Sequence, residues 1–500
     1  MAIDTTKFTK LCRDLSKLDL FGDGPPKPPY GAAPTVAKVL AAVDSGSNAL
    51  PRVYRDNYVT PLKAALPASM TNPDPRRRID GLILETVTGA VYDHAAGSPV
   101  AKELGRFLAV ISNLYRTFLD HSARAHISLP AVETLPPLAV FQSIGANGPF
   151  TVPVDAMKDE FAVPVGVVSL PSVYRPHPVL WASLAHEVGG HDVLHADDGL
   201  LDELAAGLKK MFGGGTPAPG GGLTMNQFLG FLWAWWIDEA ASDVYGLLNI
   251  GPAFATNLAF FFAALNAPRG GLGLGDTPEL RTESGFDPRD PQKLMDVHPT
   301  DILRLSLAIG VIGKLSGLTA ATRKACIAEL RGLIRVCAPG ATVIKLSGNI
   351  FIDEHSSLPL NLSLPIGPMQ KAAERVGAFI ATAKLSSLAG HSIQEINTWD
   401  ENDEQIARQI ATALNAGQGV AGQGDDAQLL AGATRAVLDA PEKYDASSRL
   451  LEAALDESFG RDAIWHPLQP DRMRVPLRSW GQDAPAPTRA LKGVRSARQA

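Results

Sequence analysis

Three histidines and a glutamate occupy ten positions of the stretch LAHEVGGHDVLH, as His186, Glu187, His191 and His195. Imidazole nitrogens bind zinc, and a carboxylate beside a metal-activated water can act as a general base. The common zinc signature H-E-x-x-H separates its histidines by four positions, which places them on one face of a helix. In this chain His186 and His191 are five positions apart, so the stretch predicts a metal site with unusual helix geometry.

The extra residue defines the backbone that such a site needs. Positions i and i+5 of a regular α-helix lie about 140° apart, so His186 and His191 could not hold one ion there. A π-bulge absorbs one extra residue and often occurs at functional sites. Gly189 and Gly190 lie in the gap, and each costs about 1 kcal/mol relative to alanine in a helix. We therefore expect an irregular turn, or a close approach to the backbone, at the two glycines.

A third ligand is expected from the stretch IDEAASDVYG, residues 237–246. Glu239 and Asp243 are spaced i, i+4 and share one face of a predicted helix that is otherwise apolar. Buried acids without partners are costly, and a metal with its histidine ligands would satisfy them. We assign Glu239 as the third ligand and Asp243 as the acceptor that orients a ligand histidine.

These motifs resemble those of a known family. HEVGGH at 186–191 is similar to the H-E-x-x-G-H signature of the dipeptidyl peptidase III zinc peptidases, in which an E-E-x-x-A-E motif follows about fifty residues later. Here DEAASD follows at 238–243, and it is also similar to the N-E-x-x-S-D motif of thermolysin-like gluzincins. The resemblance covers about 120 residues. The chain is shorter than that family and its second motif is only chemically similar, so a related or parallel gluzincin is expected.

The resemblance implies a zincin-like core with Zn²⁺ bound by His186, His191 and Glu239, and with Glu187 as the general base. The fold class expected is therefore mainly α with a small β-sheet (α+β), built as a zincin-like catalytic core with helical N- and C-terminal regions. The same nitrogen and oxygen ligands would also accept cobalt or manganese.

Peptide-bond hydrolysis is the expected reaction. Glu187 would take a proton from the attacking water and pass it to the leaving amine. His298, in MDVHPTDILRL, is the expected oxyanion donor, because gluzincins resemble one another in placing a histidine at about this distance after the third ligand. A structural His-Pro turn is the alternative. Tyr174 is a second candidate donor. Arg304 is expected in a structural salt bridge or on a substrate carboxylate.

A rival set of ligands uses the third histidine. His195 lies four positions after His191, so Glu187, His191 and His195 would line one face of an unbulged helix. That set leaves His186 unused and provides no base beside the metal. Asp238, next to the assigned glutamate, is a further candidate ligand.

Two other functions compete with peptide hydrolysis. An HD-type metal phosphohydrolase would use the adjacent pair His191–Asp192, with Asp243 as the distal acid and His126 as the upstream histidine, and it would give Glu187 no role. A non-catalytic zincin-like scaffold would keep the ligands and bind a partner without cleaving it.

Composition limits the class of protein. The 500 residues are 45% hydrophobic and 20% charged, and the net charge of −6 argues against a nucleic-acid partner. The three cysteines Cys12, Cys326 and Cys337 form no C-x-x-C pair, which favours a reducing compartment. Residues 1–20 have no apolar run typical of a signal peptide. The apolar region 227–265 is interrupted by acids and a proline, so no membrane partner is expected. A cytoplasmic protein with a peptide or protein substrate is predicted, and its oligomeric state stays open.

The elements that must position the site fall into four segments. Apolar residues at three- and four-residue steps predict a helical N-terminal region over 1–135. Short β-like runs and the metal-binding stretch define a zincin-like core over 136–340, followed by a mostly helical C-terminal region over 341–466 and a loosely ordered tail over 467–500.

Two β-like runs are expected to have particular roles. The run AVPVGVVSLPS, residues 162–172, is a candidate edge strand to which an extended peptide could add. The run VIKLSGNIFI, residues 343–352, is a candidate hairpin.

Overall fold

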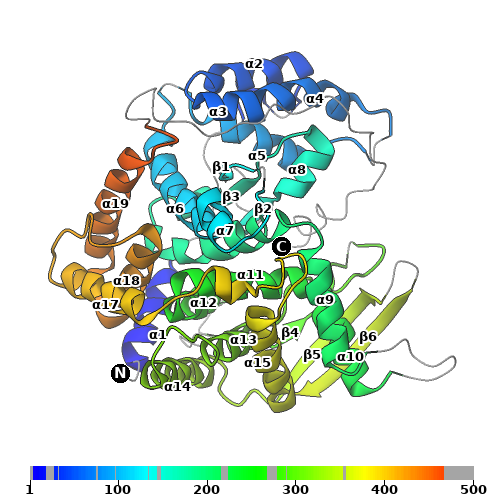
Figure 1. The fold of residues 1–500 in the computed structure, drawn as a ribbon, viewed down its shortest axis with the longest axis vertical. Coiled ribbons are helices and arrows are strands. Elements are labelled where there is room, and N and C mark those ends of the chain that lie inside the picture. The colour runs from blue at the N-terminus through cyan, green and yellow to red at the C-terminus, as the bar shows by residue number, and fades with distance from the viewer. Residues whose placement is uncertain are drawn as a thin grey trace.

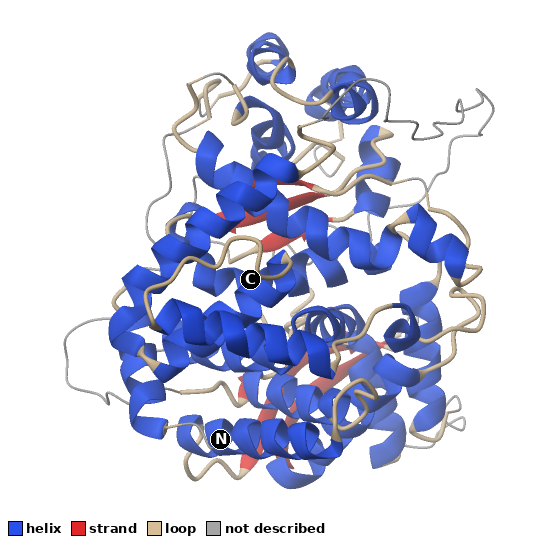
Figure 2. Ribbon diagram, turned by 60° about the vertical axis from the view of Figure 1, so that its left-hand side comes forward, coloured by secondary structure: helices blue, strands red, loops and turns tan. Residues whose placement is uncertain are grey.

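Helices form most of the chain, and two small three-stranded sheets lie in its upper and lower parts as drawn in Figure 1. In this computed structural model the strands are separated into two groups by layers of helix (Figure 2). The mainly helical α+β class expected from the sequence is confirmed. The structure describes residues 4–18, 28–31, 33–74, 77–95, 97–132, 134–142, 148–214, 223–266, 279–288, 290–352 and 356–466.

The upper sheet consists of β1 (Leu138–Gln142), β2 (Phe150–Val152) and β3 (Val167–Pro171), in the order β1-β3-β2. β1 runs parallel to β3, and β2 runs antiparallel to it. The prediction of an edge strand at 162–172 is therefore wrong, because β3 is the central strand. Its residues are all buried, as expected for a continuous apolar run covered on both faces. The edges are β1 and β2.

Helices of the N-terminal region surround this sheet. α5 contacts β1 and β3, α6 contacts β1, and α8 follows β2 directly. The helical elements before the histidine-rich stretch are α1 (Thr5–Leu15), α2 (Val36–Ser47), α3 (Arg52–Tyr54), a π-turn (Arg55–Val59), α4 (Thr60–Thr71), α5 (Gly81–Tyr92), α6 (Ala101–Leu119), α7 (His121–His126) and α8 (Val154–Phe161).

The lower part holds the second sheet and the remaining helices. β4 (Glu283–Ser284) pairs in parallel with β5 (Val343–Phe351), which pairs antiparallel with β6 (Ser357–Pro365). The stretch predicted as a hairpin is thus a single strand, and its hairpin partner is β6. The helices are α9 (Leu200–Met211), α10 (Met225–Trp235), α11 (Ile237–Ile250), α12 (Pro252–Leu265), α13 (Asp301–Ile312), α14 (Ala320–Cys337), α15 (Ile366–Thr382), α16 (Ile393–Ile396), α17 (Glu401–Asn415), α18 (Asp426–Asp439) and α19 (Tyr444–Arg461).

The three predicted segments before the tail share one hydrophobic core. α1 contacts both α12 and α18, and a single buried cluster includes side chains from Phe8 to Leu455. A second buried cluster lies between the upper sheet and α2, α4 and α5. The predicted tail, 467–500, lies outside the described residues. Among the described helices, none combines the length and apolarity that a membrane span requires.

The stretch that carries His186, His191 and His195 is not a regular α-helix. Short 3-10 turns at Ser172–Tyr174 and Pro178–Ser183 lead into a π-turn at Ala185–Gly190, and another 3-10 turn follows at Val193–His195. The wide turn predicted from the five-residue spacing is confirmed.

The double glycine explains how this π-turn packs. A Cβ atom on Gly189 would overlap the ring of Tyr245, and one on Gly190 would overlap the side chain and Cα of Ser242. Both obstacles belong to α11, so only glycine lets the π-turn approach that helix closely enough. Close approach is needed because α11 carries the predicted third ligand.

We expect the Gly190→Ala substitution to lower the free energy of unfolding by about 1–3 kcal/mol, because the new methyl group must displace α11. Gly367→Ala is the matched control, since a Cβ there meets no atom within 4 Å, and its effect should stay below about 1 kcal/mol. Urea unfolding of both variants and the wild type measures the difference. Equal losses in the two variants would contradict this account of the packing.

Candidate metal centre

Three predicted ligands meet between the π-turn and α11. His186 lies on the turn, His191 caps its end, and Glu239 lies in the first turn of α11. The Nε2 atoms of the two histidines are 3.1 Å apart. Glu239 Oε2 is 3.1 Å from His186 Nε2, and Glu239 Oε1 is 3.5 Å from His191 Nε2. One ligand atom from each residue lies within 4.8 Å of the others, and all three residues are buried.

The outer nitrogen of each ligand histidine faces a carboxylate. His186 Nδ1 is 2.9 Å from Asp243 Oδ1, and His191 Nδ1 is 3.0 Å from Asp238 Oδ1. A carboxylate only accepts hydrogen bonds, so each Nδ1 carries the proton and donates it. Both Nε2 atoms then present lone pairs to the same space, in the tautomer that metal-ligating histidines adopt.

These residues fit a divalent cation. Two imidazole lone pairs and a carboxylate converge on one buried space, and Glu239 Oε2 has no hydrogen-bond donor among the described residues. Such a group is unfavourable unless a cation or protons occupy the space between the atoms. Burial alone would lower the pKa of His191, but the Asp238 and Glu239 carboxylates outweigh burial and raise the pKa well above its ordinary value. Two nitrogens and one oxygen are the donor set of catalytic zinc sites.

Arg304 anchors the carboxylate behind His186. Its Nε is 2.7 Å from Asp243 Oδ2, and its Nη2 is 2.7 Å from Asp243 Oδ1, so the guanidinium donates two parallel hydrogen bonds. Both side chains are buried. Burial alone would raise the pKa of Asp243, but Arg304 outweighs burial and lowers it. The salt bridge expected for Arg304 is present, and it reaches the centre from α13.

Glu187, the predicted base, directly follows His186 in the chain but does not join the group of potential ligands. The described groups of potential ligands do not include it, so the rival set of Glu187, His191 and His195 is not formed. The reason is the π-turn, which rotates Glu187 away from the face that it would share with His191 in an α-helix. Thr151 on β2 has its Oγ1 at 3.2 Å from Glu187 Oε2 and at 3.0 Å from the Glu187 carbonyl oxygen.

His298 joins the cluster from the loop before α13. Its Nε2 is 3.2 Å from Glu239 Oε1, and its Nδ1 is 2.7 Å from Asp296 Oδ1. Burial alone would lower the pKa of His298, but the two carboxylates raise it. Its side chain is 23% exposed, compared with 3% for Glu239, so it lies on the more open side of the cluster.

His195 and Asp238 form an outer group. His195 Nε2 is 3.2 Å from Asp238 Oδ1, and His195 Nδ1 is 3.0 Å from Asp155 Oδ2. His191, His195 and Asp238 also offer one ligand atom each within 4.8 Å. Asp238 already accepts a hydrogen bond from His191 Nδ1. It is therefore a partner of a ligand in the first group, which consists of His186, His191 and Glu239.

The other sequence candidates do not join the three ligands. Tyr174 is buried and packs against Phe261, and burial together with the Glu187 carboxylate raises the pKa of its phenol. Asp192 turns away from the cluster, because its Oδ1 accepts a hydrogen bond of 3.0 Å from the Val154 amide. His126 is exposed at the end of α7. The HD arrangement predicted as an alternative is therefore not assembled.

Sequence reasoning missed three residues of this site: Thr151, Asp155 and Asp296. Asp296 could have been found, since it stands two positions before His298. Thr151 and Asp155 carry no local signal, because their partners lie 36 and 40 positions away.

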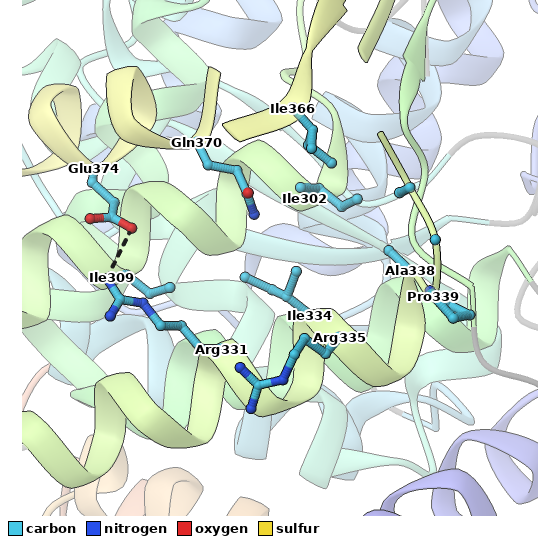
Figure 3. Close-up of a pocket in the computed structure, with 12 residues that line it drawn as sticks. Ile302, Ile309, Arg331, Ile334, Arg335, Ala338, Pro339, Ile366, Gln370 and Glu374 are labelled. Carbon is cyan, nitrogen blue, oxygen red and sulfur yellow. Dashed lines mark hydrogen bonds and ion pairs between the residues drawn. The ribbon is translucent and has the colours of Figure 1, made fainter. Parts of the chain in front are cut away.

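The cavity drawn in Figure 3 is separate from this cluster. It has a volume of about 530 Å³, lies between α13, α14 and α15, and is lined by several isoleucines and by Arg331 and Arg335 of α14. None of the ligand residues lines it. α13 contributes Ile302 and Ile309 to the cavity and Arg304 to the metal centre.

Comparisons with protein-family models, with curated proteins and with solved structures found no match to this chain. The resemblance to gluzincins therefore depends on the two motifs and on the geometry described above.

We expect Arg304→Met to lower the free energy of unfolding of the metal-free protein by about 3–5 kcal/mol, because it leaves Asp243 buried without a cation. Arg331→Met is the control: its pair with Glu374 is 3.3 Å long and half exposed, and exposed pairs contribute about 0–1 kcal/mol. Chemical denaturation measures both. A loss at Arg304 no larger than at Arg331 would show that the buried pair does not stabilise the fold.

Proposed function

We propose that this protein is a zinc-dependent peptidase of the gluzincin type, related to or parallel with the dipeptidyl peptidase III-like enzymes. One observation carries the proposal. The Nε2 atoms of His186 and His191 converge on Glu239, while each Nδ1 donates to a carboxylate, that of the buried Asp243 or of the partly exposed Asp238. Glu187 follows the first of these histidines directly in the chain, and the proposal gives it the role of general base.

His186, His191 and Glu239 would hold the metal. Zinc, when bound, supplies a Lewis acid that polarises a carbonyl oxygen and lowers the pKa of water. A zincin-like core is part of the proposal: β3 leads into the metal-binding stretch, and α11 supplies the third ligand. β2 is the edge strand nearest Glu187, through Thr151.

Glu187 is the group that moves protons. Its carboxylate accepts a proton from the water as the water oxygen bonds to the peptide carbonyl carbon, and delivers it to the amine as the carbon–nitrogen bond breaks. Thr151 fixes the orientation of the carboxylate. His298, held by Asp296 at Nδ1, donates from Nε2 to the carbonyl oxygen as negative charge develops there. The products are a carboxylate and a free amine.

The substrate is a peptide or a protein in this proposal, and the setting is cytoplasmic. The three cysteines are buried free thiols, which supports a reducing compartment. A phosphohydrolase is not supported, because Asp192 bonds to a backbone amide instead of facing the cluster.

We expect Glu187→Gln to abolish cleavage of a peptide library, with a loss of at least about 100-fold, because the amide cannot accept the proton. Zinc binding should be kept, since Glu187 is not a ligand. Glu442→Gln is the matched control at an exposed position and should cleave like the wild type. Mass spectrometry of the products gives both rates and cleavage positions. Zinc binding without cleavage by the wild type would instead favour a binding scaffold.

We expect zinc to raise the thermal stability of the metal-free protein, because the ion binds only the folded cluster. At a free concentration 100 times the Kd, the stabilisation should be about 2.7 kcal/mol. Scanning calorimetry with and without a chelator measures it. Glu239→Gln should lose most of this effect, and an unchanged melting temperature in the wild type would contradict the metal centre.

A further inference from the structure

The two carboxylates behind the ligand histidines are anchored by different cations. Asp243 is held by the Arg304 guanidinium through two hydrogen bonds. Among the described residues, the partners of Asp238 are two histidines, His191 and His195, and its Oδ1 faces His195 Nε2 at 3.2 Å. His195 therefore occupies, for Asp238, the position that Arg304 occupies for Asp243.

His195 is itself held on its far side. Its Nδ1 is 3.0 Å from Asp155 Oδ2, so both ring nitrogens face carboxylate oxygens. Since carboxylates only accept, the imidazolium, with a proton on each nitrogen, is the form of His195 that donates to both of them. Burial alone would lower the pKa of His195, but Asp238 and Asp155 outweigh burial and raise it to about 10.

The segment that supplies Asp155 is fixed to the metal-binding stretch at three points. Thr151 bonds to Glu187, the Val154 amide bonds to Asp192, and Asp155 bonds to His195. β2 and the start of α8 thus follow the stretch from the predicted base to the third histidine. A continuous chain of hydrogen bonds then runs from Asp155 through His195 and Asp238 to His191.

We propose that His195 and Asp155 are positioning residues for the metal centre. The His195 imidazolium, held by Asp155, fixes Asp238 so that His191 stays protonated at Nδ1 with Nε2 turned toward the metal. This inference depends on the proposed metal centre. It goes beyond that proposal, because it gives a role to a histidine and an aspartate that do not touch the ion.

A second cation between His191, His195 and Asp238 is the competing interpretation, since their ligand atoms also lie within 4.8 Å. Such a cation would require His191 to lose its Nδ1 proton while Nε2 already binds the first metal. The hydrogen-bonded arrangement needs only ordinary protonation states. The number of metal ions bound per chain separates the two interpretations.

The test compares metal binding by Asp155→Asn, His195→Gln and the wild type, using Zn²⁺ affinity by chelator competition and the visible spectrum of the Co²⁺ form. Loss of an outer partner typically weakens metal binding about 10–100-fold. We expect about 10-fold for Asp155→Asn, whose side chain is 48% exposed, and a larger loss for His195→Gln. The Co²⁺ spectrum should shift in both variants.

Asp159→Asn is the matched control, because it removes the same charge from an exposed position one turn along α8, and it should bind Zn²⁺ within about twofold of the wild type. Asp155→Glu should restore part of the affinity. Unfolding of the metal-free variants shows whether the fold is kept.

Each outcome bears on a different statement. Wild-type affinity and spectrum in both Asp155→Asn and His195→Gln would overturn the positioning role while leaving the metal centre intact. Two zinc ions per wild-type chain, reduced to one by His195→Gln, would overturn it in favour of a second cation site. Absence of metal binding by the wild type would remove the proposed function itself.

Discussion

The structure around this site depends on one electrostatic constraint: two imidazole lone pairs and a carboxylate share a single buried space. Asp243 and Asp238 each accept a hydrogen bond from an Nδ1–H group, and this leaves the Nε2 atoms of His186 and His191 directed at Glu239. Away from water, such a group of electron pairs is costly without a positive charge between them. The surrounding fold therefore holds a geometry that only a cation, or shared protons, can satisfy.

That constraint explains why the backbone is irregular where the ligands lie. A regular helix would separate His186 from His191 by about 140°, and the π-turn removes this separation at the cost of helical hydrogen bonding. The turn must also lie almost against α11 for Glu239 to reach both histidines. Glycine at 189 and 190 is what permits that contact. Three features therefore serve one purpose, which is to bring both histidines to Glu239: the five-residue spacing, the two glycines and the close packing of α11.

Much of this centre could be predicted from the sequence, because its signals lie within two short stretches of the chain. The five-residue spacing and the double glycine predicted the wide turn, and the i, i+4 pair Glu239 and Asp243 predicted the helix face that meets the histidines. What could not be predicted depends on tertiary pairing. The strand expected at a sheet edge is central because β1 and β2, which both precede it in the chain, pair with it on opposite sides. Thr151 and Asp155 reach the site only through that pairing, and nothing in their own neighbourhood signals it.

Pairing of charge explains how the carboxylates around the site are held. Arg304 pairs with Asp243, and the His195 imidazolium lies between Asp238 and Asp155. Glu239 is left to the two ligand histidines and to His298, whose Nε2 lies 3.2 Å from Glu239 Oε1. This pairing of charges gives a reason why each of the outer carboxylates, Asp243 and Asp238, is held by its own cation. If Asp243 and Asp238 were unpaired, their charge would compete with the ligand and the base for the ion.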